Sequence, residues 1–266
     1  METCFRIEKE GGIAWLILSR PEGRNTMTWE FFSELQKNFE AFDEDAEVRA
    51  VVIRAEGKMF TAGLDLGVAT SLLGDNSASS REKLRRQVLT LQDSFSAVER
   101  CRKPVIAAVH GWCIGGGVDL LSACDIRMAS ADAVFTIRET RIGIIADLGT
   151  LQRLPTIIGH GWSRELALTG RDFNAEEAKT IGFITHLCAD REALVAKAGE
   201  IAGEIAALPP LAVQGTKDVL LNGRDSGVYD GLKYVAQKNA AQIPNDDMME
   251  AVAAFMEKRT PRFTGH

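Results

Sequence analysis

Short apolar runs of strand length recur through the first two-thirds of the chain and constrain its fold more than any other feature. The runs are Ile13–Ser19, Val51–Ala55, Val105–Val109, Ile126–Ala129 and Val134–Ile137. Stretches with helical spacing separate them. The clearest is Trp29–Asp43, with Thr28 as its expected N-cap. Strands that alternate with helices predict an α/β fold.

The last part of the chain has a different character. Ala193–Ala207 is rich in Ala, Glu and Lys, and Pro209-Pro210 breaks it. Three further helical stretches are expected at Leu211–Leu221, Gly227–Gln242 and Asp246–Lys258. We therefore predict a core of residues 1–200, followed by a helical region of residues 201–266. That region is either a small second domain or an oligomer contact.

One segment within the core has neither the apolar runs of a strand nor the apolar spacing of a helix. Small and polar residues dominate Gly67–Arg81, which contains Gly74-Asp75-Asn76-Ser77. Such composition is typical of exposed connections. We therefore predict a mobile surface loop there.

Charge and apolar content exclude two classes of partner. The net charge of -6 and the pI near 5.4 argue against a general nucleic-acid binder, whose surface would be basic. The longest apolar runs, such as Val105–Val109 and Ile142–Ala146, are far shorter than the roughly 20 residues that span a membrane. We predict neither a nucleic-acid partner nor a membrane segment.

The ends of the chain and its cysteines suggest a compartment. Residues 1–8 are acidic and show no signal-peptide or transit pattern, and Phe263–His266 is no peroxisomal tripeptide. The five cysteines include no C-x-x-C pair, which suits a reducing compartment, and Cys113 is expected to be a buried filler. We expect a cytoplasmic, bacterial protein. The four histidines have no metal-ligand spacing, so we predict no metal.

Two glycine-rich segments follow predicted strands. Gly57–Leu66 follows Val51–Ala55, and Gly111–Leu121 follows Val105–Val109. The second lacks both the G-x-G-x-x-G register and a following G-K-[ST], which makes a nucleotide site unfavourable. Taken alone it suits equally a tight helix–strand contact or an anion site. Together, two such loops can present one backbone N–H each to a single oxygen, as in an oxyanion hole.

Four motifs carry a resemblance to a known family. They are F-T-A-G-L-D at 60–65, G-W-C-I-G-G-G-V-D at 111–119, L-Q-R-L-P at 151–155 and the ending Phe255–Phe263. In this combination the chain resembles the crotonase (enoyl-CoA hydratase/isomerase) family from Ile7 to Phe263. The resemblance implies a spiral of ββα repeats, a helical C-terminal trimerisation region, and homotrimers or homohexamers. It also implies acyl-CoA thioester substrates, with no cofactor besides the coenzyme A of the substrate.

The same resemblance assigns residues to the substrate. The backbone N–H groups of Leu64 and Gly116 would hold the thioester oxygen. Phe60, Ala62 and Asp65 would contact the ligand. Lys258 and Phe255 match a region that in this family reaches the adenine and phosphates of a neighbouring subunit's ligand. A solvated cationic helix end is the rival interpretation of that region.

Three carboxylates stand in the motifs that decide the reaction: Asp119, Glu139 and Asp147. A hydratase of this family has glutamates at the positions of Asp119 and Glu139, and glycine at the position of Asp147. The chain has the shorter Asp at 119 and adds Asp147. In this it resembles the Δ3,5-Δ2,4-dienoyl-CoA isomerases, although Ile144-Ile145 replaces smaller residues.

That resemblance implies conversion of 3-trans,5-cis-dienoyl-CoA to 2-trans,4-trans-dienoyl-CoA. Asp147 would remove the proton at C2, Glu139 would supply one at C6, and Asp119 would tune or hold its neighbours. Crowded acids in an apolar pocket should raise at least one pKa. Structural alternatives are a helix-start role for Asp119 and an ion pair of Glu139 with Arg138 or Arg141. Functional alternatives are a hydratase, a Δ3-Δ2 isomerase, and a non-catalytic acyl-CoA-binding scaffold.

Overall fold

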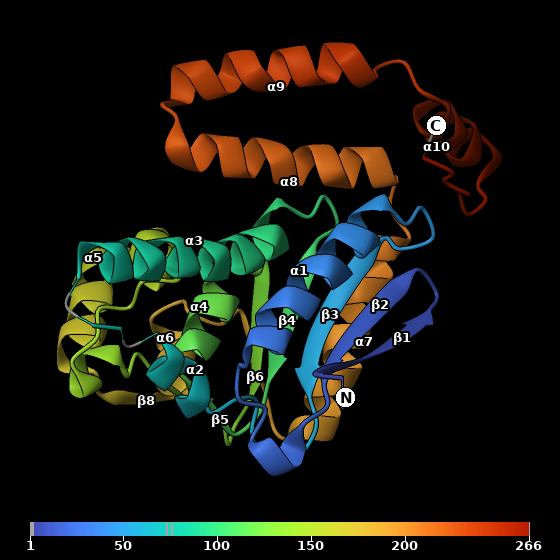
Figure 1. Ribbon diagram of the computed structural model, residues 1–266. Helices are drawn as coiled ribbons and strands as arrows, with labels where there is room; N and C mark the ends of the chain where they lie inside the picture. Colours follow the sequence, from blue (N-terminus) through green and yellow to red (C-terminus); the bar gives the residue numbers. More distant parts are fainter. Residues whose placement is uncertain (1–2, 73, 76, 266) are drawn as a thin grey trace.

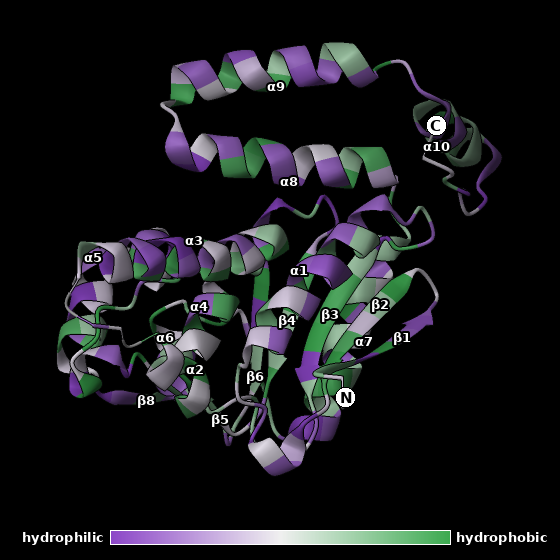
Figure 2. Ribbon diagram, in the orientation of Figure 1, coloured by the Kyte–Doolittle hydropathy of each residue, from purple (hydrophilic) through white to green (hydrophobic). Residues whose placement is uncertain are grey.

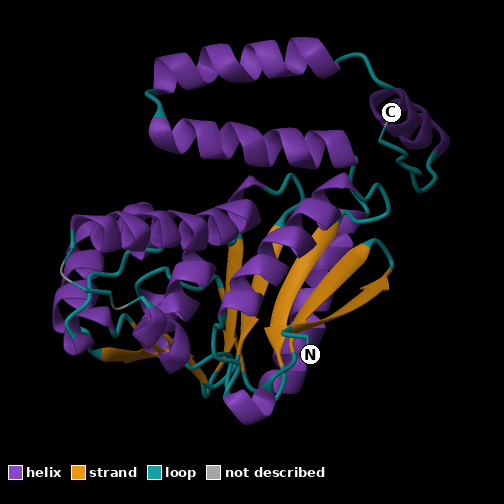
Figure 3. Cartoon of the chain, in the orientation of Figure 1, coloured by secondary structure: helices purple, strands orange, loops and turns teal. Residues whose placement is uncertain are grey.

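The computed structural model describes residues 3–72, 74–75 and 77–265. Its main sheet has the strand order β1-β2-β3-β4-β6-β9, in which β1 is antiparallel to β2 and all later pairs are parallel (Figure 3). These strands are β1 (Phe5–Glu10), β2 (Ile13–Leu18), β3 (Ala50–Ala55), β4 (Val105–Val109), β6 (Ile126–Ser130) and β9 (His186–Cys188). A second sheet joins β5 (Trp112–Ile114), β7 (Val134–Thr136) and β8 (Asp172–Asn174).

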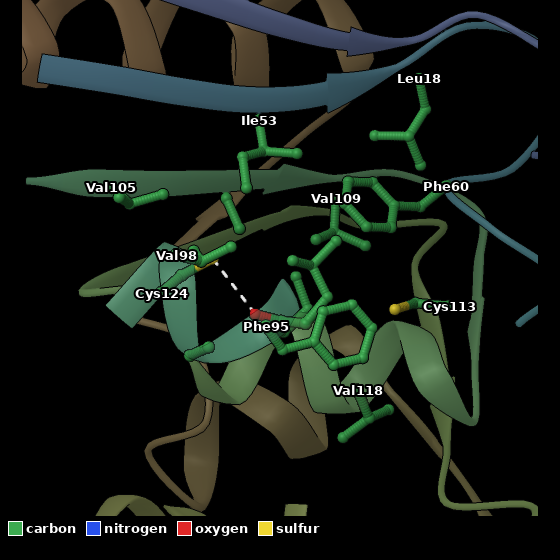
Figure 4. Packing of buried hydrophobic residues seen from close by; sticks show 14 of the residues in the cluster. Leu18, Ile53, Phe60, Phe95, Val98, Val105, Val109, Cys113, Val118 and Cys124 are labelled. Atoms are coloured by element: carbon green, nitrogen blue, oxygen red, sulfur yellow. Dashed lines mark hydrogen bonds between the residues drawn. The ribbon is translucent and has the colours of Figure 1, made fainter. Parts of the chain in front are cut away.

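Helices cover both faces of the main sheet. On one face, Val52 and Ile106 share a buried cluster with Ala198 of α7 (Arg191–Ala206). On the other face, Ile53 belongs to the cluster that contains Phe95 of α3 (Ala78–Arg100), and this cluster also includes residues of α1 (Trp29–Glu44) (Figure 4). A strand buried on both faces needs apolar side chains at successive positions. This requirement explains the continuous apolar runs of the sequence.

The chain order repeats a ββα unit, as expected. β1 and β2 precede α1, β4 and β5 precede α4 (Gly116–Ser122), and β6 and β7 precede α5 (Thr150–Thr169). Short 3₁₀ helices lie at η1 (Pro21–Gly23) and η2 (Glu139–Ile142), and α6 (Ala175–Thr180) follows β8. The predicted α/β class and its ββα repeats are therefore confirmed.

Every strand and helix named from the sequence is present, with ends that shift by a few residues. Thr28 caps α1 as predicted, because its side chain accepts a hydrogen bond from the Phe31 N–H at 3.3 Å. The unpredicted strands lack the expected pattern. β1 is an edge strand with mostly exposed side chains, whereas β5, β8 and β9 have three residues each.

The predicted loop Gly67–Arg81 is largely helical, so that prediction is wrong. α2 (Leu66–Ser71) occupies its start and α3 its end, while Leu73 and Asn76 lie outside the described residues. Polar residues in and just before this segment cap the helices. The Asp65 carboxylate accepts from the Gly67 N–H at 2.8 Å, and the Ser77 hydroxyl accepts from the Ser80 N–H at 3.2 Å.

Three C-terminal helices extend away from the sheets (Figure 1). They are α8 (Pro210–Asp225), α9 (Val228–Gln242) and α10 (Asp246–Glu257). The buried Lys217 ties α8 to the core, where its ammonium donates to Asp125 at 2.7 Å and to the Lys103 carbonyl at 3.1 Å. Apolar side chains remain exposed along α9 and α10, among them Tyr229 and Phe255. Figure 2 shows hydrophobic positions interspersed with hydrophilic ones along α8 and α9. Within the described ranges, no helix is long and apolar enough to cross a membrane.

Candidate active site

The two glycine-rich segments meet in the folded chain. Thr61 pairs with Cys113 in a parallel bridge. The Thr61 N–H donates to the Trp112 carbonyl at 3.1 Å, and the Ile114 N–H donates to the Thr61 carbonyl at 3.2 Å. The loop after β3 and the turn between β5 and α4 therefore lie side by side. We call these two segments, residues 57–66 and 111–119, the oxyanion loops.

Two backbone N–H groups are left free at this junction. A side-chain carbon built on Gly116 would lie 4.0 Å from the Leu64 nitrogen, so the two residues are close neighbours. Neither the Leu64 nor the Gly116 N–H donates to an acceptor within the part of the chain that the structure describes. Gly116 is the first residue of α4, where N–H groups have no partner inside the helix. Both groups are therefore available to one ligand oxygen.

Glycine is required at the point where the loops touch. Gly63 has φ of +85°, and a side-chain carbon there would lie 2.6 Å from the Ile114 carbonyl oxygen. Met27 fixes the backbone on either side of Leu64, because its N–H donates to Gly63 at 2.9 Å and its carbonyl accepts from Asp65 at 3.0 Å. Backbone contacts therefore fix the residues on both sides of the Leu64 N–H.

Buried side chains also hold the oxyanion loops in place through hydrogen bonds. The Thr61 hydroxyl donates to the Asn25 carbonyl at 2.6 Å and accepts from the Gly63 N–H at 3.0 Å. The Asn25 side-chain amide donates to the carbonyls of Glu56 and Met59 at 3.0 and 3.2 Å. Thr61 and Asn25 were not among the predicted site residues, since their contacts span distant parts of the sequence.

Asp119 is buried at the end of the second oxyanion loop. It lies in the first turn of α4, and its carboxylate accepts from the Thr150 N–H at 2.7 Å. Burial raises the pKa of Asp119 to about 6, the hydrogen bonds from Thr150 oppose the rise, and the charge of Asp147 adds to it. The carboxylate therefore binds the start of α5 as well as standing in its own helix.

Glu139 faces the same site from η2. A side-chain carbon on Gly115 would lie 2.9 Å from its Oε1, which shows that the carboxylate lies against the Gly115 backbone. Its Oε2 is buried and has no hydrogen-bond partner among the described residues. Burial, followed by the charge of Asp119, raises the pKa of Glu139 to about 7. This unpartnered oxygen is free to meet a ligand.

The alternative ion pairs of Glu139 do not form. Arg138 instead binds Asp172 at 2.8 Å, and the Arg141 guanidinium donates to the Thr169 carbonyl at 3.4 Å. Among the described residues Glu139 has no ion-pair partner. A carboxylate that is half-buried and unpaired suits proton transfer better than a structural role.

Asp147 lies on the connection between η2 and α5 and is exposed. Loss of hydration still raises the pKa of its carboxyl group above the ordinary value. The charge of Asp147 also raises the pKa values of Asp119 and Glu139, so the three acids interact. Asp147 borders a cavity of about 330 Å³ that Gln92, Ser96 and Gln152 also line. A larger cavity of about 710 Å³, between α8 and α5, contains none of the three acids.

The three loop residues that were predicted to contact the ligand differ in burial and in their contacts. The Phe60 side chain is fully buried in the core beside Leu18 and Val109, so only its backbone can face a ligand (Figure 4). Ala62 is half-buried in the loop, and Asp65 caps α2 while also accepting from the Thr26 hydroxyl at 3.0 Å.

Lys258 and Phe255 lie at the end of α10, across the molecule from α4 and α5 (Figure 1). Their own chain therefore does not bring them to the carboxylates. Phe255 is 85% exposed, whereas Lys258 ends the helix with φ of +53°. Among the described residues, no group of three His, Cys, Asp or Glu side chains could hold a metal ion.

Comparison with known proteins identifies the family of the chain. The family model described as Enoyl-CoA hydratase/isomerase matches residues 8–266. A protein of Arabidopsis thaliana named Delta(3,5)-Delta(2,4)-dienoyl-CoA isomerase, peroxisomal, is 44% identical over 97% of this chain and 95% of its own length. The mitochondrial protein of that name from Homo sapiens is 44% identical over 91% of this chain and 75% of its own length.

A solved structure confirms the architecture. The crystal structure of an enoyl-CoA hydratase from Bacillus anthracis superposes with a TM-score of 0.92 at 33% identity, and the match covers 99% of this chain and 100% of that one. The fold is thus shared across proteins named for different reactions, so it cannot by itself choose between them.

The relatives correct the expected compartment. We expected a cytoplasmic, bacterial protein, but the similar dienoyl-CoA isomerases are eukaryotic proteins named as peroxisomal or mitochondrial. The expectation is therefore wrong. It depended on missing patterns at the two ends of the sequence, and such an absence does not identify a compartment.

Proposed function

The chain belongs to the enoyl-CoA hydratase/isomerase family, and within it we propose conversion of 3-trans,5-cis-dienoyl-CoA to 2-trans,4-trans-dienoyl-CoA. One observation carries the proposal: Glu139 lies against Gly115 and Asp119 binds the Thr150 N–H, three residues after Asp147, beside the free N–H groups of Leu64 and Gly116. The relatives named for this reaction are 42–44% identical to the chain.

The reaction begins at C2 of the thioester. The Asp147 carboxylate removes a C2 proton, and the electron pair of that C–H bond is delocalised onto the thioester carbonyl to give a dienolate. The negative charge of the dienolate intermediate is shared with the thioester oxygen, which the N–H groups of Leu64 and Gly116 stabilise. Each such donor is worth on the order of a hundredfold or more in rate.

Protonation at C6 completes the shift. The electron pair of the dienolate then forms C2=C3, the electrons of C3=C4 move to C4=C5, and those of C5=C6 take a proton from the Glu139 carboxyl group. The product has double bonds at C2 and C4, and no oxidant or reductant is consumed. After turnover Asp147 carries a proton and Glu139 lacks one, so both must return to their starting states. The exposure of Asp147 gives it a direct route to solvent.

The electrostatics support these roles. A pKa of about 7 leaves much of Glu139 protonated at neutral pH, as a proton donor requires. Asp147 is exposed, so its raised pKa still allows ionisation, as a base requires. Asp119 accepts the Thr150 N–H and fixes the start of α5, which favours a holding role.

The runner-up is a hydratase or a Δ3-Δ2 isomerase. The structural neighbour from Bacillus anthracis is named a hydratase, and Glu139 is consistent with either reaction. In a hydratase, however, two glutamates would activate one water. Here the second position holds Asp119, whose carboxylate is already occupied by Thr150. A non-catalytic scaffold would have no need for the unpartnered Glu139 oxygen.

The test is a panel of CoA thioesters given to the purified protein. We expect conjugated-diene absorbance to rise with a 3,5-dienoyl-CoA and turnover of that substrate to exceed hydration of a 2-enoyl-CoA. Asp147→Asn should abolish the rise, whereas Asp230→Asn, on exposed α9, is the matched control. Faster hydration would favour the runner-up. Binding without hydrogen exchange at C2 in deuterated water would favour the scaffold.

We also propose that the chain forms a homotrimer or homohexamer. Exposed apolar side chains on α9 and α10 support self-association: Val228, Tyr229, Leu232, Met248, Met249, Val252, Phe255 and Met256. Self-association would also allow Lys258 and Phe255 to reach the ligand of a neighbouring subunit. Light scattering during gel filtration measures the mass directly. A monomer at micromolar concentration would contradict this assembly.

A further inference from the structure

We propose that Arg153 is a positioning residue, which holds the backbone next to Asp147. It belongs to an ion-pair network that begins on α8. In this network Glu99 of α3 forms ion pairs with both Arg224 of α8 and Arg153 of α5. None of these residues faces the reacting atoms, so their effect would pass through the segment that carries Asp147. The inference rests on the proposed function only in assigning a catalytic role to Asp147.

The segment 147–150 depends on outside contacts, because only its last residue belongs to a helix. Gln92 of α3 donates to the Asp147 carbonyl at 2.6 Å. Arg153 donates to the Leu148 carbonyl at 3.4 Å, and the Thr150 N–H donates to Asp119 at 2.7 Å. Side chains from different elements therefore fix successive peptide groups.

Arg153 lies unusually close to this backbone. Gly149 has φ of +127°, and a side-chain carbon there would lie 1.8 Å from the Arg153 Nη1. The guanidinium thus occupies the space that any other residue at 149 would fill. Glycine at this position serves both the backbone conformation and the approach of the arginine.

Glu99 holds the guanidinium in this place. The Arg153 Nε and Nη2 donate to the two Glu99 oxygens at 3.1 and 3.3 Å, and Nη2 donates to the Ser96 hydroxyl at 3.2 Å. Such a fork fixes orientation as well as distance. Burial would raise the pKa of Glu99, but the hydrogen bonds from Arg153 and Arg224 outweigh it and lower the pKa. Glu99 is therefore an anion at neutral pH.

The position of Arg153 explains why it needs this partner. It lies in the first turn of α5, where the helix dipole disfavours positive charge. Its side chain is 11% exposed and that of Glu99 is 16% exposed, so water screens the pair weakly. Arg224 adds a second cation to Glu99 from α8. Asp147, Arg153 and Arg224 also line one cavity, which connects the C-terminal helices to the site.

The experiment compares full-length variants by kinetics and by amide hydrogen exchange. Arg153→Gln should lower kcat by about 10- to 100-fold, with KM changed by less than about threefold, because the base is misplaced while ligand binding persists. Exchange at the Thr150 amide should be about tenfold faster or more, with peptides of α7 unchanged. Arg153→Lys should recover part of both losses. Arg224→Gln should have a smaller effect in the same direction.

Arg171→Gln is the matched control, because Arg171 also binds two glutamates, Glu165 and Glu177, but on the surface. It should leave kcat and the Thr150 amide unchanged. A folded Arg153→Gln with wild-type kcat and wild-type exchange overturns the proposal. If Arg153→Gln does not fold, Arg153→Lys and Arg224→Gln decide by the same two measurements. If the wild type does not isomerise dienes, the proposed function fails, and hydrogen exchange still decides whether Arg153 holds the segment.

Discussion

The oxyanion loops and the carboxylate segment, residues 139–153, lie in one site but are held by different contacts. In the loops, backbone hydrogen bonds and glycines set the geometry, as at Gly63 and Leu64. In the carboxylate segment, side chains from α3, α4 and α5 form hydrogen bonds with the backbone. The loops should therefore be sensitive to added atoms. The segment should be sensitive to lost charges and hydrogen bonds.

The largest effect is expected from Glu139→Gln, in the carboxylate segment. Glutamine keeps the shape of the side chain but cannot supply the C6 proton, so kcat should fall by about 10³-fold. Stopped-flow absorbance with a 3,5-dienoyl-CoA measures this loss. Circular dichroism should show an unchanged fold, since the Glu139 Oε2 has no partner to lose.

Glu176→Gln is the matched control for that variant. Glu176 is an exposed glutamate in the first turn of α6, outside the site. It should retain full activity. Equal loss in both variants would mean that Glu139 has no special role and that the comparison between the two regions fails.

Gly63→Ala should have the next largest effect, in the oxyanion loops. The added carbon would lie 2.6 Å from the Ile114 carbonyl at a φ of +85°, so the two loops must separate. Misplacing a donor pair should cost about 10²-fold in kcat. Gly203→Ala, at a half-buried position of α7 with no heavy atom within 4 Å of the added carbon, is the control. Wild-type kcat in Gly63→Ala would show that the loops tolerate movement.

The same difference explains how well the sequence predicted each region. The oxyanion loops follow predictable strands and are rich in glycine, so an oxyanion hole could be predicted from the pattern, whereas Leu64 and Gly116 were named through the family resemblance. The three acids were found through the family resemblance. Thr150 and Gln92 were missed because their partners lie 31 and 55 residues away in sequence. Nothing local marks such contacts.

The fold shows the same limit. Buried strands were predictable because both faces demand apolar residues, whereas the exposed edge strand β1 looks polar. The segment 67–81 was mistaken for a loop because its Asp and Ser residues favour turns as well as helix caps. Whether such a residue starts a helix depends on the side chains that pack farther along.

The pH dependence should give a moderate effect that separates the two regions. Because Glu139 donates as the acid and its pKa is about 7, kcat should fall about tenfold per unit above pH 7. The observed values belong to the coupled trio, since Asp119 titrates near 6 and Asp147 is also raised. In Gly63→Ala the residual activity should keep this profile, because the substitution removes none of the three acids. A flat profile in the wild type would contradict Glu139 as donor.

The free energy of unfolding should also depend on pH through the ionisation of Glu139. The folded-state pKa of Glu139 lies above its ordinary value near 4.5, so the folded state retains the proton longer. Stability is therefore lost as pH rises from about 4.5 to 7, by about 3 kcal/mol. Chemical denaturation of wild type and Glu139→Gln across this range measures the loss, and the variant should have the flatter curve. If stability changes equally with pH in the wild type and in Glu139→Gln, Glu139 is not the cause of the loss.

The smallest effect is expected from Thr61→Val, a polar deletion within the oxyanion loops. Valine preserves shape but leaves the Asn25 carbonyl and the Gly63 N–H unpaired, which should destabilise the fold by about 1–2 kcal/mol. Because the bridge between Thr61 and Cys113 uses backbone groups, the loops should stay together and kcat should fall by about threefold or less. Urea denaturation and kcat on one preparation test both parts. A loss of kcat as large as that of Gly63→Ala would show that side chains, as well as backbone, hold the oxyanion loops.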